Sequence, residues 1–150
     1  MDMAKLERLI QTTELKTNLL RKFRPGEQHP VYIKYDPVFD AFMMLFVPPE
    51  TEVVVHYIDD HVGLLYTPED LEIVGLQVEA FEHSFLANHD TVRRVWKLSD
   101  SCEELTDVGD IIFAFEKRAP VVAQEVTKAT AGLLGKPGRE LEKAAAYAYA

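Results

Sequence analysis

Hydrophobic and polar residues change their spacing twice along the chain and divide it into three segments. Residues 3–24 place apolar side chains three to four positions apart, the spacing of one helix face, and Pro25-Gly26 ends the pattern. Residues 31–79 hold short apolar runs separated by turn-forming residues, which is typical of β-strands. Residues 80–150 return to helical spacing. The sequence therefore predicts an N-terminal helix within 1–24, a sheet over 31–79 and a helical segment over 80–150.

Five apolar runs of the middle segment are candidates for strands. They are residues 31–35, 41–47, 51–58, 61–67 and 71–79. Short connections favour antiparallel neighbours, and hence a meander whose strand order follows the chain. The run AFMMLFV at 41–47 is apolar on both faces, so we expect a central strand covered on both sides. The pattern predicts a single α+β domain over residues 1–150, an antiparallel β-meander with helices packed on it.

The helical segment after the sheet divides further. We expect a short helix over 80–89, and a Ser-x-x-Glu capping box opens another over 101–118. Pro120 suits the first turn of a third helix, and Gly135 suits its end. The tail RELEKAAAYAYA favours helix but has few large apolar residues. We expect the tail to be docked weakly or to be mobile.

Composition and charge exclude several functional classes. The net charge of −9 repels a phosphate backbone, so we expect no nucleic-acid binding. No apolar run approaches the roughly 18 residues of a membrane span. Asp2 and Glu7 interrupt the stretch where an export signal needs apolar residues, and the single cysteine, Cys102, cannot form an intramolecular disulfide. We therefore expect a cytoplasmic protein.

One basic cluster stands out in this acidic chain. Lys16, Arg21, Lys22 and Arg24 lie near the end of the first predicted helix. Positive charge there complements the partial negative charge of a helix C-terminus. We interpret the cluster as a helix-end feature.

The stretch HYIDDH, residues 56–61, is the strongest candidate for chemistry. With Asp59-Asp60 as a two-residue hairpin loop, His56 pairs with Gly63. This register places His56 and His61 on one sheet face, roughly 7–8 Å apart at the backbone. The other face then carries Val55, Tyr57, Leu64 and Tyr66. Two imidazoles at that distance, with Asp60 at the tip, could bind a metal, although a zinc site needs three or four ligands. The alternative is a plain hairpin, because aspartate is also an ordinary turn residue.

The middle of the chain resembles the YuzE-like family of small bacterial proteins, a domain of unknown function. The likeness lies in KYDPVFDAFMMLF and HVGLLYTPEDLEIVGLQVEAF and covers about residues 31–82. The residues that carry it are Tyr35, Asp36, Pro37, Asp40, Ala41, Val74, Gly75, Leu76 and Glu79. Gln77 departs from the family, which has an acidic residue there. The resemblance implies a compact β-meander with a helix on one face, and it brings no known active site.

Three functions fit this pattern, and a non-catalytic function is favoured over an enzyme. The apolar excess at 41–47 and the missing catalytic motifs favour a non-catalytic interaction or structural module without a cofactor, acting as a homodimer or with an unidentified protein partner. We assign its interface to Phe42, Met44, Phe46, Leu6, Leu9 and Ile10. One alternative is a hydrolase that uses His56, His61 and zinc or another divalent metal. The other is a binder of a small apolar ligand between sheet and helices.

Overall fold

A five-stranded antiparallel sheet organises the chain in the computed structural model, which describes residues 11–27, 29–100 and 108–148. The strands are β1 (Tyr32–Asp36), β2 (Ala41–Leu45), β3 (Val54–Tyr57), β4 (Val62–Tyr66) and β5 (Ile73–Glu79). Two short helices precede the sheet, the 3-10 helix η1 (Thr12–Glu14) and α2 (Asn18–Arg21). Five follow it: the π-helix η2 (Phe81–Phe85), α3 (Leu86–Asn88), α4 (Asp90–Asp100), α5 (Val108–Leu134) and α6 (Lys136–Tyr147). The predicted α+β class with a C-terminal helical segment is confirmed.

The strand order differs from the predicted meander. It runs β1-β2-β5-β4-β3, so β5 lies between β2 and β4, and β3 lies at an edge. Strand β5 is almost wholly buried, whereas β3 is only half-buried, and a strand with two apolar faces belongs in the middle of a sheet. The connection through Pro48-Pro49 carries the chain from β2 to the far edge. Short loops alone therefore misled the prediction, because this connection is long enough to pass two strands.

The predicted N-terminal helix is interrupted in the part that the structure describes. Between η1 and α2, Lys16 is extended and bridges Glu72. Its amide donates to the carbonyl of Leu71 at 2.8 Å, and its carbonyl accepts from the amide of Ile73 at 2.9 Å. A backbone that pairs with β5 cannot also make helical i to i−4 hydrogen bonds. Residues 3–10 of the predicted helix lie outside the described residues.

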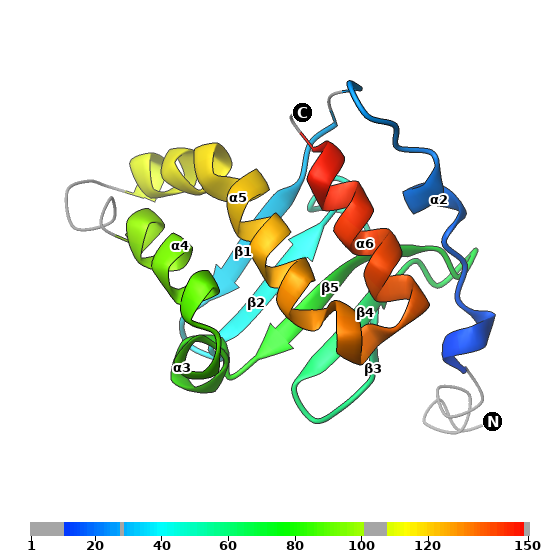
Figure 1. Ribbon diagram of the computed structural model, residues 1–150, viewed down its shortest axis with the longest axis horizontal. Helices are drawn as coiled ribbons and strands as arrows, with labels where there is room; N and C mark the ends of the chain where they lie inside the picture. The colour runs from blue at the N-terminus through cyan, green and yellow to red at the C-terminus, as the bar shows by residue number, and fades with distance from the viewer. Residues whose placement is uncertain (1–10, 28, 101–107, 149–150) are drawn as a thin grey trace.

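The second half of the chain contains two further departures from the prediction. Helix α5 runs through Pro120, where we predicted a new helix to begin, and Figure 1 shows that α5 changes direction along its length. Proline inside a helix removes a hydrogen bond and bends the helix, at a cost of about 3 kcal/mol. Burial of Val122, Ala123 and Val126 just after the proline favours continuing the helix nonetheless. The predicted capping box at 101–104 lies outside the described residues.

The tail is docked, not loose. Helix α6 packs along α5, and Figure 1 shows the pair crossing in front of the sheet. Leu141, Ala144 and Ala145 are fully buried. Small side chains suffice for burial here because they let the two helices approach closely, which the prediction from large apolar residues overlooked.

The two faces of the sheet are covered unequally. On the helix-covered face, Phe42 and Met44 of β2 join the main core with Phe81 of η2 and Trp96 of α4. On the second face, Leu45, Leu65 and Val74 form a smaller cluster beneath α2 and the segments that flank β3. Strand β2 is therefore apolar on both faces, as predicted. The helices after β5 cover only one of those faces.

We predict that Gly138→Ala lowers the free energy of unfolding by about 1–3 kcal/mol. A Cβ at position 138 would lie 2.7 Å from the Cβ of Leu134 and 2.8 Å from the carbonyl oxygen of Ala131, so α6 must move away from α5. Chemical denaturation followed by circular dichroism measures the change.

Gly132→Ala is the matched control, because a Cβ at that position of α5 meets nothing within 4 Å. Its effect should be neutral or stabilising by up to about 1 kcal/mol. Equal stability of the wild type and the Gly138→Ala variant would show that α6 is not docked against α5 as described.

Candidate interaction surface

The HYIDDH hairpin has a different register from the predicted one. His56 pairs with Leu64, and the amide of Ile58 donates to the carbonyl of Val62 at 2.8 Å. The loop thus holds three residues, 59–61. Its shape follows from the Asp59 carboxylate, which accepts from the amides of His61 at 2.8 Å and Val62 at 2.6 Å. A side chain that caps its own turn replaces the glycine that a two-residue loop would need.

The new register separates the two histidines. His56 shares the helix-covered face with Leu64, where its Nε2 lies 2.9 Å from Oγ1 of Thr12. Burial lowers the pKa of His56 below its ordinary value of 6.5. His61 and Asp60 are exposed at the loop tip. The predicted metal site of His56, His61 and Asp60 is therefore not assembled, and Val55 and Tyr57 face away from Leu64 and Tyr66, contrary to the predicted grouping.

His61 instead contributes to a small cleft between the hairpin loop, η2 and α5. The cleft has a volume of about 280 Å³ and is also lined by Asp59, Glu79 and His89. Nδ1 of His89 lies 2.8 Å from the carbonyl oxygen of Phe85, which fixes that imidazole. Within the described residues, however, no three histidine, cysteine, aspartate or glutamate side chains gather closely enough to hold a metal ion.

Tyr35 and Asp40, two of the residues that carry the family resemblance, have structural roles at the end of the sheet where β2 begins and β5 ends. Asp40 precedes β2 with a positive φ of 52°, and its carbonyl accepts from the amide of Phe81 at 3.0 Å. Its carboxylate accepts from the amides of Glu82 at 2.7 Å and His83 at 3.0 Å, and from the Tyr35 hydroxyl at 2.7 Å. Asp40 thus attaches the first helical turn after β5 to the start of β2.

The electrostatics of this cluster favour a charged Asp40 and a neutral Tyr35. Burial raises the pKa of Tyr35 above its ordinary value, and hydrogen bonds to Glu82 and Asp40 raise it further. Burial alone would raise the pKa of Asp40, but hydrogen bonds from Tyr35, Glu82 and His83 lower it overall. A phenol held neutral and a carboxylate held charged form a stable donor–acceptor pair, and this pair has no tendency to move a proton.

The second face of the sheet is open at the end nearer this cluster. One row across the five strands, which we name the open row, consists of Lys34, Met43, Gln77, Gly63 and Tyr57. In the neighbouring row, Leu45 and Leu65 are buried beneath Leu19 and the segments flanking β3. In the open row, Met43 is half-buried and Tyr57 is 49% exposed. The described segments that cover the neighbouring row therefore do not extend over the open row.

The open row borders a broad hollow of about 900 Å³. The hollow is lined by Lys34, Met43 and Gln77 from the open row, together with Phe39 and Glu79. Phe39 comes from the turn between β1 and β2 and is 77% exposed. The Asp36 carboxylate stabilises that turn by accepting from the amides of Val38 and Phe39 at 2.9 and 3.3 Å. A large aromatic ring is thus held in solvent by a well-formed turn.

Tyr57 is held across the surface of the sheet. Its hydroxyl donates to Oε1 of Glu79 at 2.9 Å, and Gly63, which has no side chain, lies between the two strands that carry them. Burial of one side of the ring raises the pKa of Tyr57, and the hydrogen bond to Glu79 raises it further. The ring therefore presents a fixed, neutral aromatic face to solvent.

The predicted interface residues on β2 need correction. Phe42, Met44 and Phe46 are buried within the chain beneath the helices, because alternate residues of a strand point to opposite faces. Leu6, Leu9 and Ile10 lie outside the described residues. Sequence reasoning missed Phe39 and Tyr57. The DPVF turn could have revealed Phe39, since an aromatic residue inside a turn has no neighbouring strand to cover it.

The space between sheet and helices, where the alternative function places an apolar ligand, contains packed aromatic rings. Phe42 stacks on Phe81 with ring centroids 4.5 Å apart, and Trp96 meets Phe81 edge-on at 4.9 Å. These contacts are typical of a filled core. No helix in the described ranges is long and apolar enough to cross a membrane.

Comparisons with protein-family models, with curated proteins and with solved structures find no match to this chain. The resemblance to the YuzE-like family therefore stays a prediction.

We predict that Asp40→Asn lowers the free energy of unfolding by about 1–3 kcal/mol at neutral pH. Asparagine tolerates the same positive φ, so the loss isolates the carboxylate's acceptor role. The pKa of Asp40 is depressed in the folded chain, so its contribution is present above 3.8, the ordinary value, and is lost as the pH falls through the folded-state pKa. The stability difference between variant and wild type should therefore shrink below pH 3.8.

Chemical denaturation at several pH values measures this difference. Asp60→Asn, at an exposed loop position, is the control and should be neutral. A variant as stable as the wild type at neutral pH would contradict the role assigned to Asp40.

Proposed function

We propose that the protein is a non-catalytic interaction module that forms a homodimer, with the open row and Phe39 as the surface where two copies meet. The observation that carries this proposal is two exposed aromatic residues beside the sheet face that the described helices leave open: Phe39 in the turn between β1 and β2, and Tyr57 on the edge strand β3. Exposed apolar patches with polar rims mark protein interaction sites in soluble proteins. Aromatic residues and methionine are also enriched in the buried centres of such interfaces.

The charges around this surface favour a second copy as the partner. Lys34 lies at one end of the open row, and Asp36 and Glu79 line the same hollow. A surface that carries both signs of charge can pair with itself across a two-fold axis, because each cation can face the partner's carboxylate. Closed two-fold dimers are also the commonest assemblies of soluble proteins.

The position of the surface suits an interaction that leaves the fold unchanged. The strands beneath it are backed by the main core, so association needs no rearrangement of the sheet. The Tyr57 ring is already positioned by its hydrogen bond to Glu79, and the backbone that carries Phe39 is ordered by the Asp36 carboxylate. Binding through preordered side chains loses little conformational entropy.

We predict that Phe39→Glu weakens the dimer by about 10–100-fold, the equivalent of losing one large buried apolar side chain. The ring is exposed in the single chain, so the substitution should not unfold it. Sedimentation equilibrium over a range of concentrations measures the dissociation constant.

Val121→Glu is the matched control, because Val121 is an exposed apolar residue of α5, away from the second sheet face. It should dimerise as the wild type does. A wild-type protein with the mass of one chain throughout, or equal weakening by both substitutions, would contradict the proposed surface.

A further inference from the structure

A groove between α2 and α6 gathers positive charge in an otherwise acidic protein. It has a volume of about 370 Å³, and its charged lining consists of Arg21, Arg24 and Lys143 with a single carboxylate, Glu140. The whole chain has a net charge of −9, whereas this lining has three cations to one anion. Such a local reversal of sign attracts an anion to this groove in particular.

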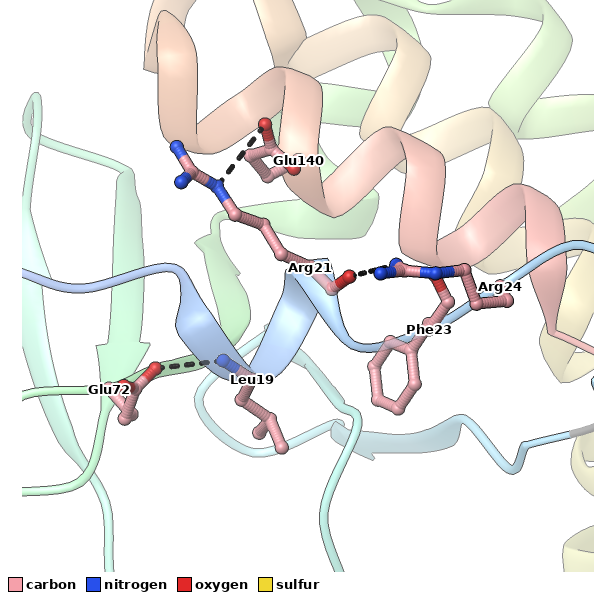
Figure 2. Close-up of polar contacts among 6 residues, drawn as sticks. All are labelled: Leu19, Arg21, Phe23, Arg24, Glu72 and Glu140. Atoms are coloured by element: carbon pink, nitrogen blue, oxygen red, sulfur yellow. Dashed lines mark hydrogen bonds and ion pairs between the residues drawn. The ribbon is translucent and has the colours of Figure 1, made fainter.

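The one carboxylate in the groove compensates its cations only in part. Oε1 of Glu140 lies 3.9 Å from Nε of Arg21, which is an ion pair without a close hydrogen bond (Figure 2). Neither Arg24 nor Lys143 has an ion-pair partner among the described residues. The groove therefore retains positive charge for a ligand.

The guanidinium of Arg24 is held in place before any ligand arrives. Its Nη1 donates to the carbonyl of Arg21 and, at 3.3 Å, to that of Phe23, as part of the α2 helix end (Figure 2). Arg24 thus lies at the end of α2 and not at the end of the longer helix predicted over residues 3–24. These hydrogen bonds occupy one nitrogen of a planar fork that offers five N–H donors. An arginine that is already ordered loses little freedom when it binds an anion.

The short helix α2, which ends at Arg21 and lies three residues before Arg24, is itself attached to the sheet. At its start, the amide of Leu19 donates to Oε2 of Glu72 at 3.0 Å, which attaches α2 to the residue before β5 (Figure 2). Leu20 is buried in the main core, whereas Leu19 packs on the second face. Four residues of helix would not hold a fixed geometry alone, but these contacts position Arg21, and the carbonyls of Arg21 and Phe23 in turn hold Arg24.

The groove also has an apolar wall. Phe23, Pro25 and Tyr147 line it, and the ring of Phe23 stacks on His29 with centroids 3.8 Å apart. An aromatic or aliphatic group can lie against this wall while its charged end meets the cations. The volume is within the range of small-molecule sites.

We propose that this groove binds a small organic anion, a phosphate or carboxylate attached to an apolar group. The site uses none of the residues of the proposed dimer surface, so either proposal can fail without the other. Its two arginines and lysine supply charge-assisted hydrogen bonds, and Phe23 and Tyr147 select a ligand with an apolar body over a bare ion.

The test is titration of the full-length protein with phenyl phosphate, followed by amide chemical shifts in nuclear magnetic resonance. We expect saturable shifts confined to α2 and the C-terminal half of α6, and weaker binding of inorganic phosphate, which lacks the apolar group. Benzoate in place of phenyl phosphate distinguishes a carboxylate ligand from a phosphate ligand. The stronger of these two probes names the class, and saturable binding of either supports the site.

Substitutions make the test specific to the groove. Arg24→Ala and Lys143→Ala should each weaken binding by about tenfold, the loss expected of one charge-assisted hydrogen bond. Lys143→Ala leaves the α2 helix end intact, so it remains informative if Arg24→Ala perturbs folding. Lys128→Ala, on α5 and paired with Glu125, is the charge-matched control and should bind as the wild type does.

Two results would overturn the anion site itself, and a third would overturn its apolar wall. One is the lack of saturable shifts at α2 and α6 with either organic probe up to about 10 mM, a very weak affinity for a designated site. The other is equal weakening by Lys128→Ala and Lys143→Ala, which would reveal general attraction to positive charge. Inorganic phosphate binding as tightly as phenyl phosphate would likewise refute the role of the apolar wall.

Discussion

The carboxylate of Asp40 is the constraint on which the arrangement of sheet and helices depends. It joins the neighbouring β1 and β2, through the hydroxyl of Tyr35 and the start of β2, to the amides of Glu82 and His83, which follow β5 and lie 42 and 43 residues further along the chain. A charged acceptor with several donors is stabilising only when all of them are held in register. The pairing of Ala41 with Glu79 supplies that register, because it brings the beginning of β2 beside the end of β5.

Where the chain leaves β5 decides which sheet face is covered. Ala80 has a positive φ of 52°, and the turn at Asp40 directs η2 toward the helix-covered face. The helices that follow pack on that side, where Figure 1 shows α5 and α6 crossing the sheet. Among the described residues, the second face receives only α2 and the segments beside β3. Its open row is therefore a consequence of the direction in which the helical segment leaves the sheet.

The exposed apolar surface of Met43, Tyr57 and Phe39 costs solvation free energy in a lone chain, and a partner that covers it recovers that free energy. Gly63 keeps the row shallow, and Tyr57 lies across it with its hydroxyl bonded to Glu79. Both features make the surface flat and fixed, which suits contact with another flat surface. The same cause, one-sided covering by helices, thus accounts for the fold and for the proposed function.

The positions of the strands could be predicted from sequence, but their order could not. Alternation of apolar residues locates each strand, whereas the pairing of β2 with β5 depends on contacts between distant residues. The predicted register of the HYIDDH hairpin was wrong for a local reason. The Asp59 carboxylate accepts two backbone hydrogen bonds, and the loop is therefore one residue longer than predicted. One residue of register moves a side chain to the opposite face. The break at Lys16 was hidden because a strand-like bridge leaves no signal in helical spacing.

The sequence could predict that an apolar interaction surface exists, but not which residues form it. The apolar excess of β2 correctly indicated that both of its faces need cover, yet the side of each residue follows from the register and the direction of the helices. Met43 and Met44 illustrate this, because the two neighbours lie on opposite faces and only Met44 is fully buried. Patterns of residue type do not distinguish them.

The two methionines also offer the most direct measurement of the central claim, that two copies meet through the open row. With methionine methyl groups labelled with carbon-13, a soluble paramagnetic probe broadens the resonance of any methyl group that solvent reaches. The account predicts that the Met43 signal is broadened in dilute protein and protected in concentrated protein, while Met44 is protected at both. A Met43 signal broadened equally at every concentration would contradict it.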